Sequence, residues 1–295
     1  MDVRRHIYAV LAELHISKLQ GNAFEDFFAD VAQRAFGTDF VKIRAAGKSG
    51  DKKCDGYKKS TDTLFACYAP RGTTPKKLQA KISSDLSGAM VHWPDMREWC
   101  FVHNDGDGLD VDTFKLMEEM ASKNETLKVV EMGPLDLKKL ILSLDNDDLA
   151  DLFGPAPSTA NFSRYGFPEI ARVVEKVSQS AELGDAAVQA PSPEKLAKND
   201  LSEDIAALLQ SGEVKAPLFR RFFADTARVL EGERIAAWFR TRFAELEADT
   251  KDSSEIFYTL VDDAGGLAYR PQPEQAAVLG LMSYLFHSCD IFRDP

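Results

Sequence analysis

The chain has 295 residues, a length that as a prior corresponds to about two domains. Apolar residues make up 44% and charged residues 28%, which is typical of globular proteins and excludes a chain that is disordered throughout. The longest nearly apolar run, residues 276–286, is too short to span a bilayer. Glu13 and His15 interrupt the apolar stretch near the N-terminus, so we expect no secretory signal.

The charge is unevenly distributed along the chain. The formal net charge is −11, yet residues 42–81 contain eleven Lys or Arg and three Asp, a local charge of +8 that leaves −19 for the remainder. A basic island of this kind is either a solvated face or the footprint of a polyanion.

The four cysteines do not form a metal-binding or disulfide pattern. Cys54, Cys67, Cys100 and Cys289 lie far apart, and no C-x-x-C spacing occurs. This excludes a zinc ribbon and a disulfide scaffold, and we expect reduced thiols in a cytoplasmic protein.

The first half of the chain predicts alternating helices and strands. Hydrophobic periodicity and turn residues place them as follows: helices at 2–18 and 23–36, a strand at 39–44, a turn-rich loop at 47–56, a strand at 63–68, a helix at 76–90, a strand at 98–103, a helix at 110–122, a strand at 127–131 and a helix at 135–143. This order predicts an α/β domain with a mixed sheet covered by helices.

The second half predicts helices only. A Gly-Pro-Ala-Pro segment at 154–157 breaks the α/β pattern, and residues 178–199 have a linker composition. Helical periods follow at 201–209, 216–230 and 233–248, and residues 275–288 are apolar almost all round, as in a central core helix or half of an interface. We therefore expect an α/β domain at 1–157, a linker with a short helix at 158–199 and an all-helical domain at 200–295.

Acidic residues in the first half follow a distinctive order relative to the predicted helices and strands. Glu25 lies on a predicted helix; one strand later comes Gly-Asp-Lys-Lys-Cys-Asp-Gly at 50–56, which contains Asp51 and Asp55, and then the buried strand around Ala66 and Tyr68. This layout resembles the PD-(D/E)xK restriction-endonuclease-like fold, particularly its Mrr-like branch. The resemblance implies that Glu25 and Asp55 bind Mg²⁺, with Asp51 as a further oxygen donor.

The chemistry of phosphodiester hydrolysis explains the pattern of that family. A metal polarises the phosphate and activates a water, and a cation stabilises the developing charge. In the family the next strand supplies Glu or Gln and, two residues later, Lys. Here Ala66 and Tyr68 occupy these positions, so the chain departs from the pattern. Lys77 or Lys81 on the following helix could supply the missing cation.

The basic island covers the same stretch and predicts contacts with a phosphate backbone. The lysines expected to make them are Lys48, Lys52, Lys53, Lys58 and Lys59, and Tyr68 is a candidate to stack on a base.

The helical segments of the second half end in Tyr-Leu-Phe-His-Ser-Cys-Asp-Ile-Phe at 284–292. With these segments and this end, residues 199–292 resemble the C-terminal module of ABC three-component systems. These predicted bacterial defence systems combine an SMC-like ABC ATPase, a small middle component and a variable effector. The resemblance implies the first two as partners.

Three functions remain open from the sequence. The chain is a Mg²⁺-dependent nuclease-like effector, or an adaptor whose decayed nuclease fold binds nucleic acid or an ATPase partner without catalysis, or an assembly scaffold only. Ala66 and Tyr68 favour the adaptor.

Overall fold

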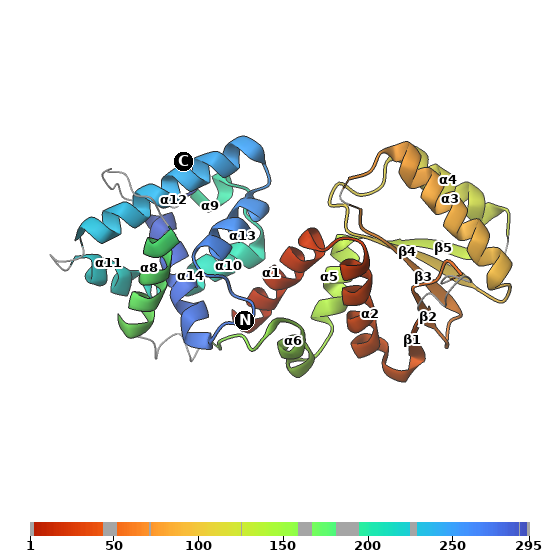
Figure 1. Cartoon of the computed structure of the whole chain (residues 1–295), viewed down its shortest axis with the longest axis horizontal. Helices are drawn as coiled ribbons and strands as arrows, with labels where there is room; N and C mark the ends of the chain where they lie inside the picture. The colour runs from red at the N-terminus through yellow and green to blue at the C-terminus, as the bar shows by residue number, and fades with distance from the viewer. Residues whose placement is uncertain are drawn as a thin grey trace. The chain divides into compact units, whose positions relative to one another are not determined.

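The computed structural model divides the chain into two compact units, residues 15–148 and residues 1–14 with 149–295, whose elements are labelled in Figure 1. The structure describes residues 3–43, 52–70, 72–124, 126–158, 167–180, 195–224, 229–288 and 290–293. Each unit is described by itself below.

The α/β unit contains five strands and the helices that cover them. Its elements are α1 (Val3–Lys18, whose last turn belongs to this unit), α2 (Asn22–Phe36), the short 3-10 helix η1 (Gly37–Asp39), β1 (Phe40–Lys42), β2 (Gly56–Lys58), β3 (Thr63–Tyr68), α3 (Pro75–His92), β4 (Glu98–His103), α4 (Val111–Ser122), β5 (Lys128–Met132), α5 (Pro134–Leu142) and the start of α6 (Asn146–Phe153).

The sheet is mixed, with strand order β1-β2-β3-β4-β5. β1, β2 and β3 form an antiparallel meander in which Gly56 lies opposite Phe65. β3, β4 and β5 run parallel, with Tyr68 opposite His103. Parallel neighbours need crossover connections, and α3 and α4 supply them. The expected α/β class with a mixed sheet is therefore confirmed.

The two faces of β3 pack against different helices. Phe65 contacts Phe28 of α2, with ring centroids 5.2 Å apart. Leu64 and Ala66 belong instead to a core cluster with residues of α3 such as Ile82. Side chains alternate between faces along a strand, so α2 and α3 cover opposite sides of the sheet. Both faces of β3 are covered, which explains why its sequence is an unbroken apolar run.

The second unit is helical. Its elements are α8 (Phe167–Ser180), α9 (Lys195–Lys198), α10 (Glu203–Glu213), α11 (Ala216–Phe223), α12 (Val229–Asp249), α13 (Ser253–Asp263) and α14 (Gln272–His287). Helix α14 is buried on nearly all sides, with all residues from Gln275 to Ser283 enclosed, and it packs against α8, α10, α11 and α13. Of the two alternatives for the apolar segment at 275–288, the central core helix is confirmed.

The structure divides the chain at other positions than 157 and 200. Most of α1 groups with the helical unit, where the Tyr8 ring lies 6.3 Å from that of Phe153 and the Tyr8 hydroxyl accepts a hydrogen bond from the N–H of Ala156 at 3.2 Å. The expected linker at 158–199 contains α8 and α9, and residues 181–194 lie outside the described residues.

The described cysteines are buried, and no disulfide joins them. Cys54, Cys67 and Cys100 are in the reduced state, and Cys289 lies outside the described residues. Burial raises the pKa of the Cys100 thiol far above its usual value, so this thiol is poorly nucleophilic. Among the described helices, none combines the length and the apolar character needed to cross a bilayer.

Gly212 lies where α10 contacts α14, so a substitution there measures how closely the two helices pack. A Cβ atom added there would lie 2.3 Å from the backbone oxygen of Leu279, too close for the helices to accept without moving apart. We expect Gly212→Ala to lower the free energy of unfolding by about 1–3 kcal/mol, despite the ~1 kcal/mol that Ala gains in a helix. Urea denaturation measures the change. Gly106→Ala, at a site with open space around it, is the control, and equal stability of the two variants would contradict the close packing.

Candidate nuclease-like site

Asp55 lies at the end of β3, just before β2 begins. Its N–H donates to the carbonyl of Phe65 at 2.9 Å, and its carbonyl accepts from the N–H of Ile43 at 3.0 Å. The carboxylate accepts a hydrogen bond from the N–H of Cys67 through Oδ2 at 2.7 Å. β2 pairs with β3 only as far as Phe65, so this side chain serves a backbone group that the strand ladder no longer reaches.

Glu25 lies in the first turn of α2, and the start of this helix is tied to the same end of β3. The N–H of Gly21 donates to the carbonyl of Ala69 at 2.7 Å. Gly21 has a positive φ of 52°, a conformation that glycine adopts readily. The backbone therefore brings the turn that carries Glu25 to the strand end that carries Cys67.

The carboxylates of Asp55 and Glu25 both act electrostatically on the thiol of Cys67. Its pKa is raised well above the usual value, first because the thiol is completely buried, and then because the negative charges of Asp55 and Glu25 act on it. Both acids are half-buried. The structure thus brings Glu25 and Asp55 to one end of β3 although they are thirty positions apart in the sequence.

Ala66 and Tyr68 face the opposite side of the sheet, toward α3. Ala66 is 4% exposed and part of the core cluster, so it supplies no ligand oxygen. Tyr68 is half-buried, its ring centroid lies 6.2 Å from that of Phe101, and its hydroxyl lies 3.4 Å from the Thr73 hydroxyl. Its ring is therefore packed on one side and accessible only in part.

Lys81 is the cation that the structure brings to Tyr68. Its Nζ lies 5.8 Å from the centroid of the Tyr68 ring. The same Nζ lies 2.5 Å from Asp85 Oδ2, and Lys53 Nζ lies 2.9 Å from Asp85 Oδ1. The Asp85 side chain is only 6% exposed, so a buried carboxylate holds two lysines and offsets part of their charge.

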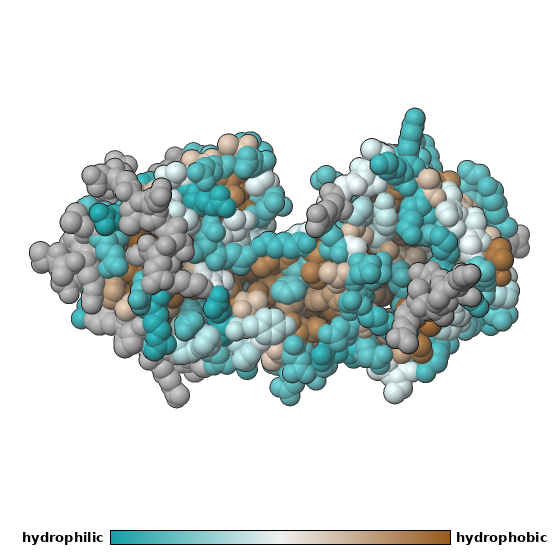
Figure 2. Space-filling view, viewed as in Figure 1, coloured by the Kyte–Doolittle hydropathy of each residue, from teal (hydrophilic) through white to brown (hydrophobic). Residues whose placement is uncertain are grey.

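Lys77 lies in the first turn of α3, where its N–H donates to the capping hydroxyl of Thr74 at 3.4 Å. Its side chain is exposed, and among the described residues no carboxylate pairs with it. Figure 2 shows hydrophilic and weakly polar side chains over α3, and Met90 and Val91 near its end are exposed as well.

The other predicted nucleic-acid contacts form two groups. Lys52 and Lys53 adopt left-handed backbone conformations, and the Lys52 carbonyl accepts a hydrogen bond from the Trp93 indole at 3.2 Å. Lys58 and Lys59 lie at the far end of β2, where their charges help Ser60 to lower the pKa of Asp39. Lys48 and Asp51 lie outside the described residues.

The two acids fit a hard cation such as Mg²⁺, which prefers carboxylate oxygens and keeps several waters. Oδ2 of Asp55 accepts the hydrogen bond from Cys67. In the described part of the chain, no three His, Cys, Asp or Glu side chains gather closely enough to hold a metal ion. A cation at Glu25 and Asp55 would therefore complete its shell with water or substrate oxygens.

Sequence reasoning missed a pocket of about 290 Å³ on the Tyr68 side of the sheet, at the ends of β3 and β4. His103 forms part of its wall. Its Nδ1 accepts the N–H of Asp105 at 3.1 Å, so the proton is on Nε2, 2.7 Å from Glu131 Oε1. Both ring nitrogens are used, and this histidine holds the loop after β4 in place. The partners come from different strands, and no sequence spacing reveals them.

Comparison with known proteins found one family model that matches the second half of the chain. Residues 169–293 match the family model of CTD10, C-terminal domain 10 of the ABC-three component (ABC-3C) systems. The resemblance expected for residues 199–292 is confirmed, and it begins earlier, at α8. No curated protein and no solved structure matched the chain, so the resemblance of the first half to restriction endonucleases stays a prediction.

Replacing Asp55 separates its structural role from its charge. Asp55→Ala leaves the N–H of Cys67 without its acceptor, and we expect a loss of about 1–3 kcal/mol in the free energy of unfolding. Asp55→Asn keeps an acceptor oxygen, so its loss should stay below ~1 kcal/mol. Urea denaturation of both variants measures the difference. Equal losses would show that the hydrogen bond does not fix the strand end.

Proposed function

We propose that the chain is the effector of an ABC-3C defence system, with a helical unit that docks the other components and a nuclease-like α/β unit. The observation that carries the docking role and the defence context is the match of residues 169–293 to CTD10. An ABC ATPase and a small middle component are the partners that this match favours.

The nuclease-like role of the α/β unit is supported by the order of its elements. The helix with Glu25, strand β1, Asp55 and strand β3 follow one another as the resemblance requires. Support also comes from the two acids, which act on the same buried thiol.

In this proposal each residue has a defined task. Glu25 and Asp55 hold a Mg²⁺ ion, which when bound polarises the phosphodiester and lowers the pKa of an attacking water. The Cys67 N–H fixes the orientation of the Asp55 carboxylate. Lys81, which lies beside the Tyr68 ring on the α3 side of the sheet, or the exposed Lys77 would have to reach past the end of β3 to offset the charge that develops on the phosphate.

A second function, binding without catalysis, is favoured by three observations. Ala66 is buried and has no ligand atom, Tyr68 replaces the lysine of the family, and Lys81 shares the buried Asp85 with Lys53. An adaptor of this kind would use the lysines of the α/β unit to hold nucleic acid and would need no metal.

Cleavage of plasmid DNA in the presence of Mg²⁺ or Mn²⁺, with and without the ATPase partner, tests the nuclease. We expect Asp55→Asn to reduce the cleavage rate by roughly 100-fold or more, since it removes a charge at the reacting centre but keeps the hydrogen-bond acceptor. Glu25→Gln should have a similar effect.

The controls for this assay are Asp136→Asn and Glu119→Gln, which neutralise acids on α5 and α4. Both should cleave like the unchanged protein. No cleavage by the unchanged chain under any of these conditions, or undiminished cleavage by Asp55→Asn, contradicts the nuclease and leaves the adaptor.

The lysines are tested by the salt dependence of DNA binding. Neutralising Lys52, Lys53, Lys58 and Lys59 together to Gln should reduce the slope of log K against log salt concentration by about 3–4, because each lost phosphate contact contributes about 0.9. Fluorescence anisotropy at several salt concentrations measures the slope.

A matched control removes the same charge from exposed lysines elsewhere in the unit: Lys115, Lys123, Lys128 and Lys139. If both sets change the slope equally, the effect is one of net charge, and the predicted contact surface is wrong. Binding that requires Mg²⁺ would favour the nuclease over the adaptor.

A further inference from the structure

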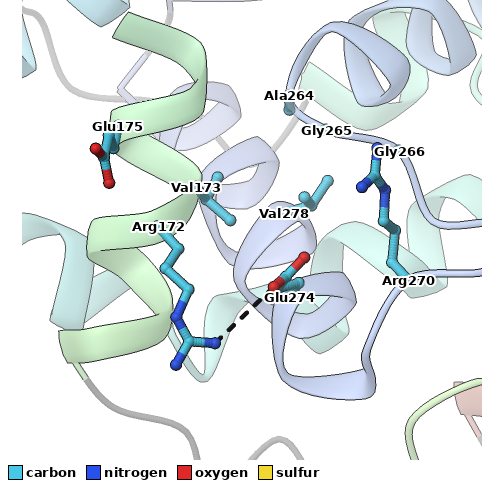
Figure 3. A pocket seen from close by; sticks show the side chains of 9 residues that line it. All are labelled: Arg172, Val173, Glu175, Ala264, Gly265, Gly266, Arg270, Glu274 and Val278. Carbon is cyan, nitrogen blue, oxygen red and sulfur yellow. Dashed lines mark ion pairs between the residues drawn. The ribbon is translucent and has the colours of Figure 1, made fainter. Parts of the chain in front are cut away.

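The helical unit contains a pocket of about 350 Å³ between α8, the turn after α13 and the start of α14. Val173 and Val278 lie between α8 and α14 (Figure 3) and form an apolar floor, 4% and 2% exposed. Polar and charged side chains surround this floor. A volume of this order suits one or two amino-acid side chains.

Arg270 is the charged residue that distinguishes the pocket. Its side chain extends toward Gly266 in Figure 3, and among the described residues no carboxylate pairs with its guanidinium. The other arginine, Arg172, lies 3.9 Å from Glu274. Glu175 points away from the floor (Figure 3). The lining therefore carries two arginines and two glutamates, and among the described residues Arg270 is its one arginine outside an ion pair.

The backbone that carries Arg270 is held from both sides. The Arg270 carbonyl accepts a hydrogen bond at 2.8 Å from the side chain of Gln275, which is 1% exposed. Tyr269, immediately before it, has a positive φ of 53°, and its N–H donates to the carbonyl of Phe153 at 3.0 Å. A non-glycine residue in this conformation is strained and persists because its surroundings fix it. Arg270 is thus presented by a fixed turn.

The chemistry of the pocket selects among anions. A polyphosphate would need several cations or unused backbone N–H groups. Here Glu274 already pairs with Arg172, and the N–H groups of Gly265 and Gly266 donate to the carbonyls of Asp262 and Val261. A single carboxylate matches the guanidinium of Arg270, which is in no ion pair among the described residues, and forms a planar, paired contact with it. The valine floor adds affinity for a neighbouring aliphatic group.

We infer that this pocket binds a partner polypeptide at a segment in which a carboxylate stands beside an aliphatic side chain. The inference deepens the proposed docking role and rests on it, because all lining residues fall within the segment that matches CTD10. The occupant is a component of the same system, and the contact is an ion pair to Arg270 over an apolar anchor.

Methyl NMR of the full chain, with labelled valine side chains, tests the pocket directly. The probe is N-acetyl-leucine, which carries one carboxylate and one isobutyl group. We expect it to shift the methyl signals of Val173 and Val278 in a saturable way. N-acetyl-leucinamide, its neutral counterpart, should bind at least tenfold more weakly, and so should inorganic phosphate.

Three variants define the role of the arginine. Arg270→Gln should weaken binding of N-acetyl-leucine at least tenfold, while Arg270→Lys keeps the charge without the planar guanidinium and should be intermediate. Arg234→Gln, an exposed arginine on α12, should bind like the unchanged chain. The unperturbed valine spectrum of each variant shows that it is folded.

Several outcomes would overturn the inference: no saturable shift, equal binding of the amide or of phosphate, or undiminished binding by Arg270→Gln. Co-purification with the ATPase and middle component separates this inference from the docking role. If the unchanged chain and Arg270→Gln retain the partners equally, the pocket is not the contact, although docking stands. If the unchanged chain retains no partner but binds N-acetyl-leucine through Arg270, docking fails and the pocket remains a carboxylate site.

Discussion

The candidate site depends on the need to satisfy the backbone polar groups at the end of β3. Along the edge that faces β2, strand β3 continues beyond Phe65, the last residue that pairs with β2. The N–H of Cys67 donates a hydrogen bond to the carboxylate of Asp55, and the carbonyl of Ala69 accepts one from the N–H of Gly21. An unpaired buried backbone group is costly. The same requirement therefore places Asp55 and the start of the helix that carries Glu25.

The alternation of side chains along β3 explains where a replacement for the missing lysine must come from. Phe65 and Cys67 face α2, whereas Ala66 and Tyr68 face α3, because successive residues of a strand point to opposite faces. A cation near Tyr68 therefore has to come from α3, and Lys81 is the residue found there. Its partner Asp85 shows that this cation also has a structural role, since Asp85 is buried and needs compensation.

The sequence predicts those parts of the fold whose signal is local. β3 and β4 were predicted over their full lengths, because each is a six-residue apolar run with polar or turn residues at its ends. β2 was not predicted, since three residues from Gly56 to Lys58 carry no period and pair only because β1 and β3 flank them. Helix α6 was missed as well. The grouping of α1 with the helical unit could not be predicted, because an amphipathic helix does not identify the core it covers.

The sequence predicts only those residues of the candidate site that follow from the order and spacing of its elements. Glu25 and Asp55 follow from the succession of helix, strand and turn. The environment of the lysines does not, because nothing in the pattern of α3 distinguishes a buried Asp85 from an exposed acid at the same spacing from Lys81. The pocket at His103 and the pairing of Asp85 with Lys53 depend on contacts between distant segments, which a single sequence does not encode locally.

The burial of α14 determines where the helical unit can recognise a partner. An apolar segment at 275–288 allowed either a core helix or an interface, and the structure uses its apolar surface inside the unit. A docking surface of this unit would then lie on the outer helices and the turns between them. On such a surface a specific contact needs a fixed charge beside a small apolar floor, since scattered mobile charges contribute little. The turn between α13 and α14 provides this combination, because the buried Gln275 of the core helix holds the backbone of Arg270 in place.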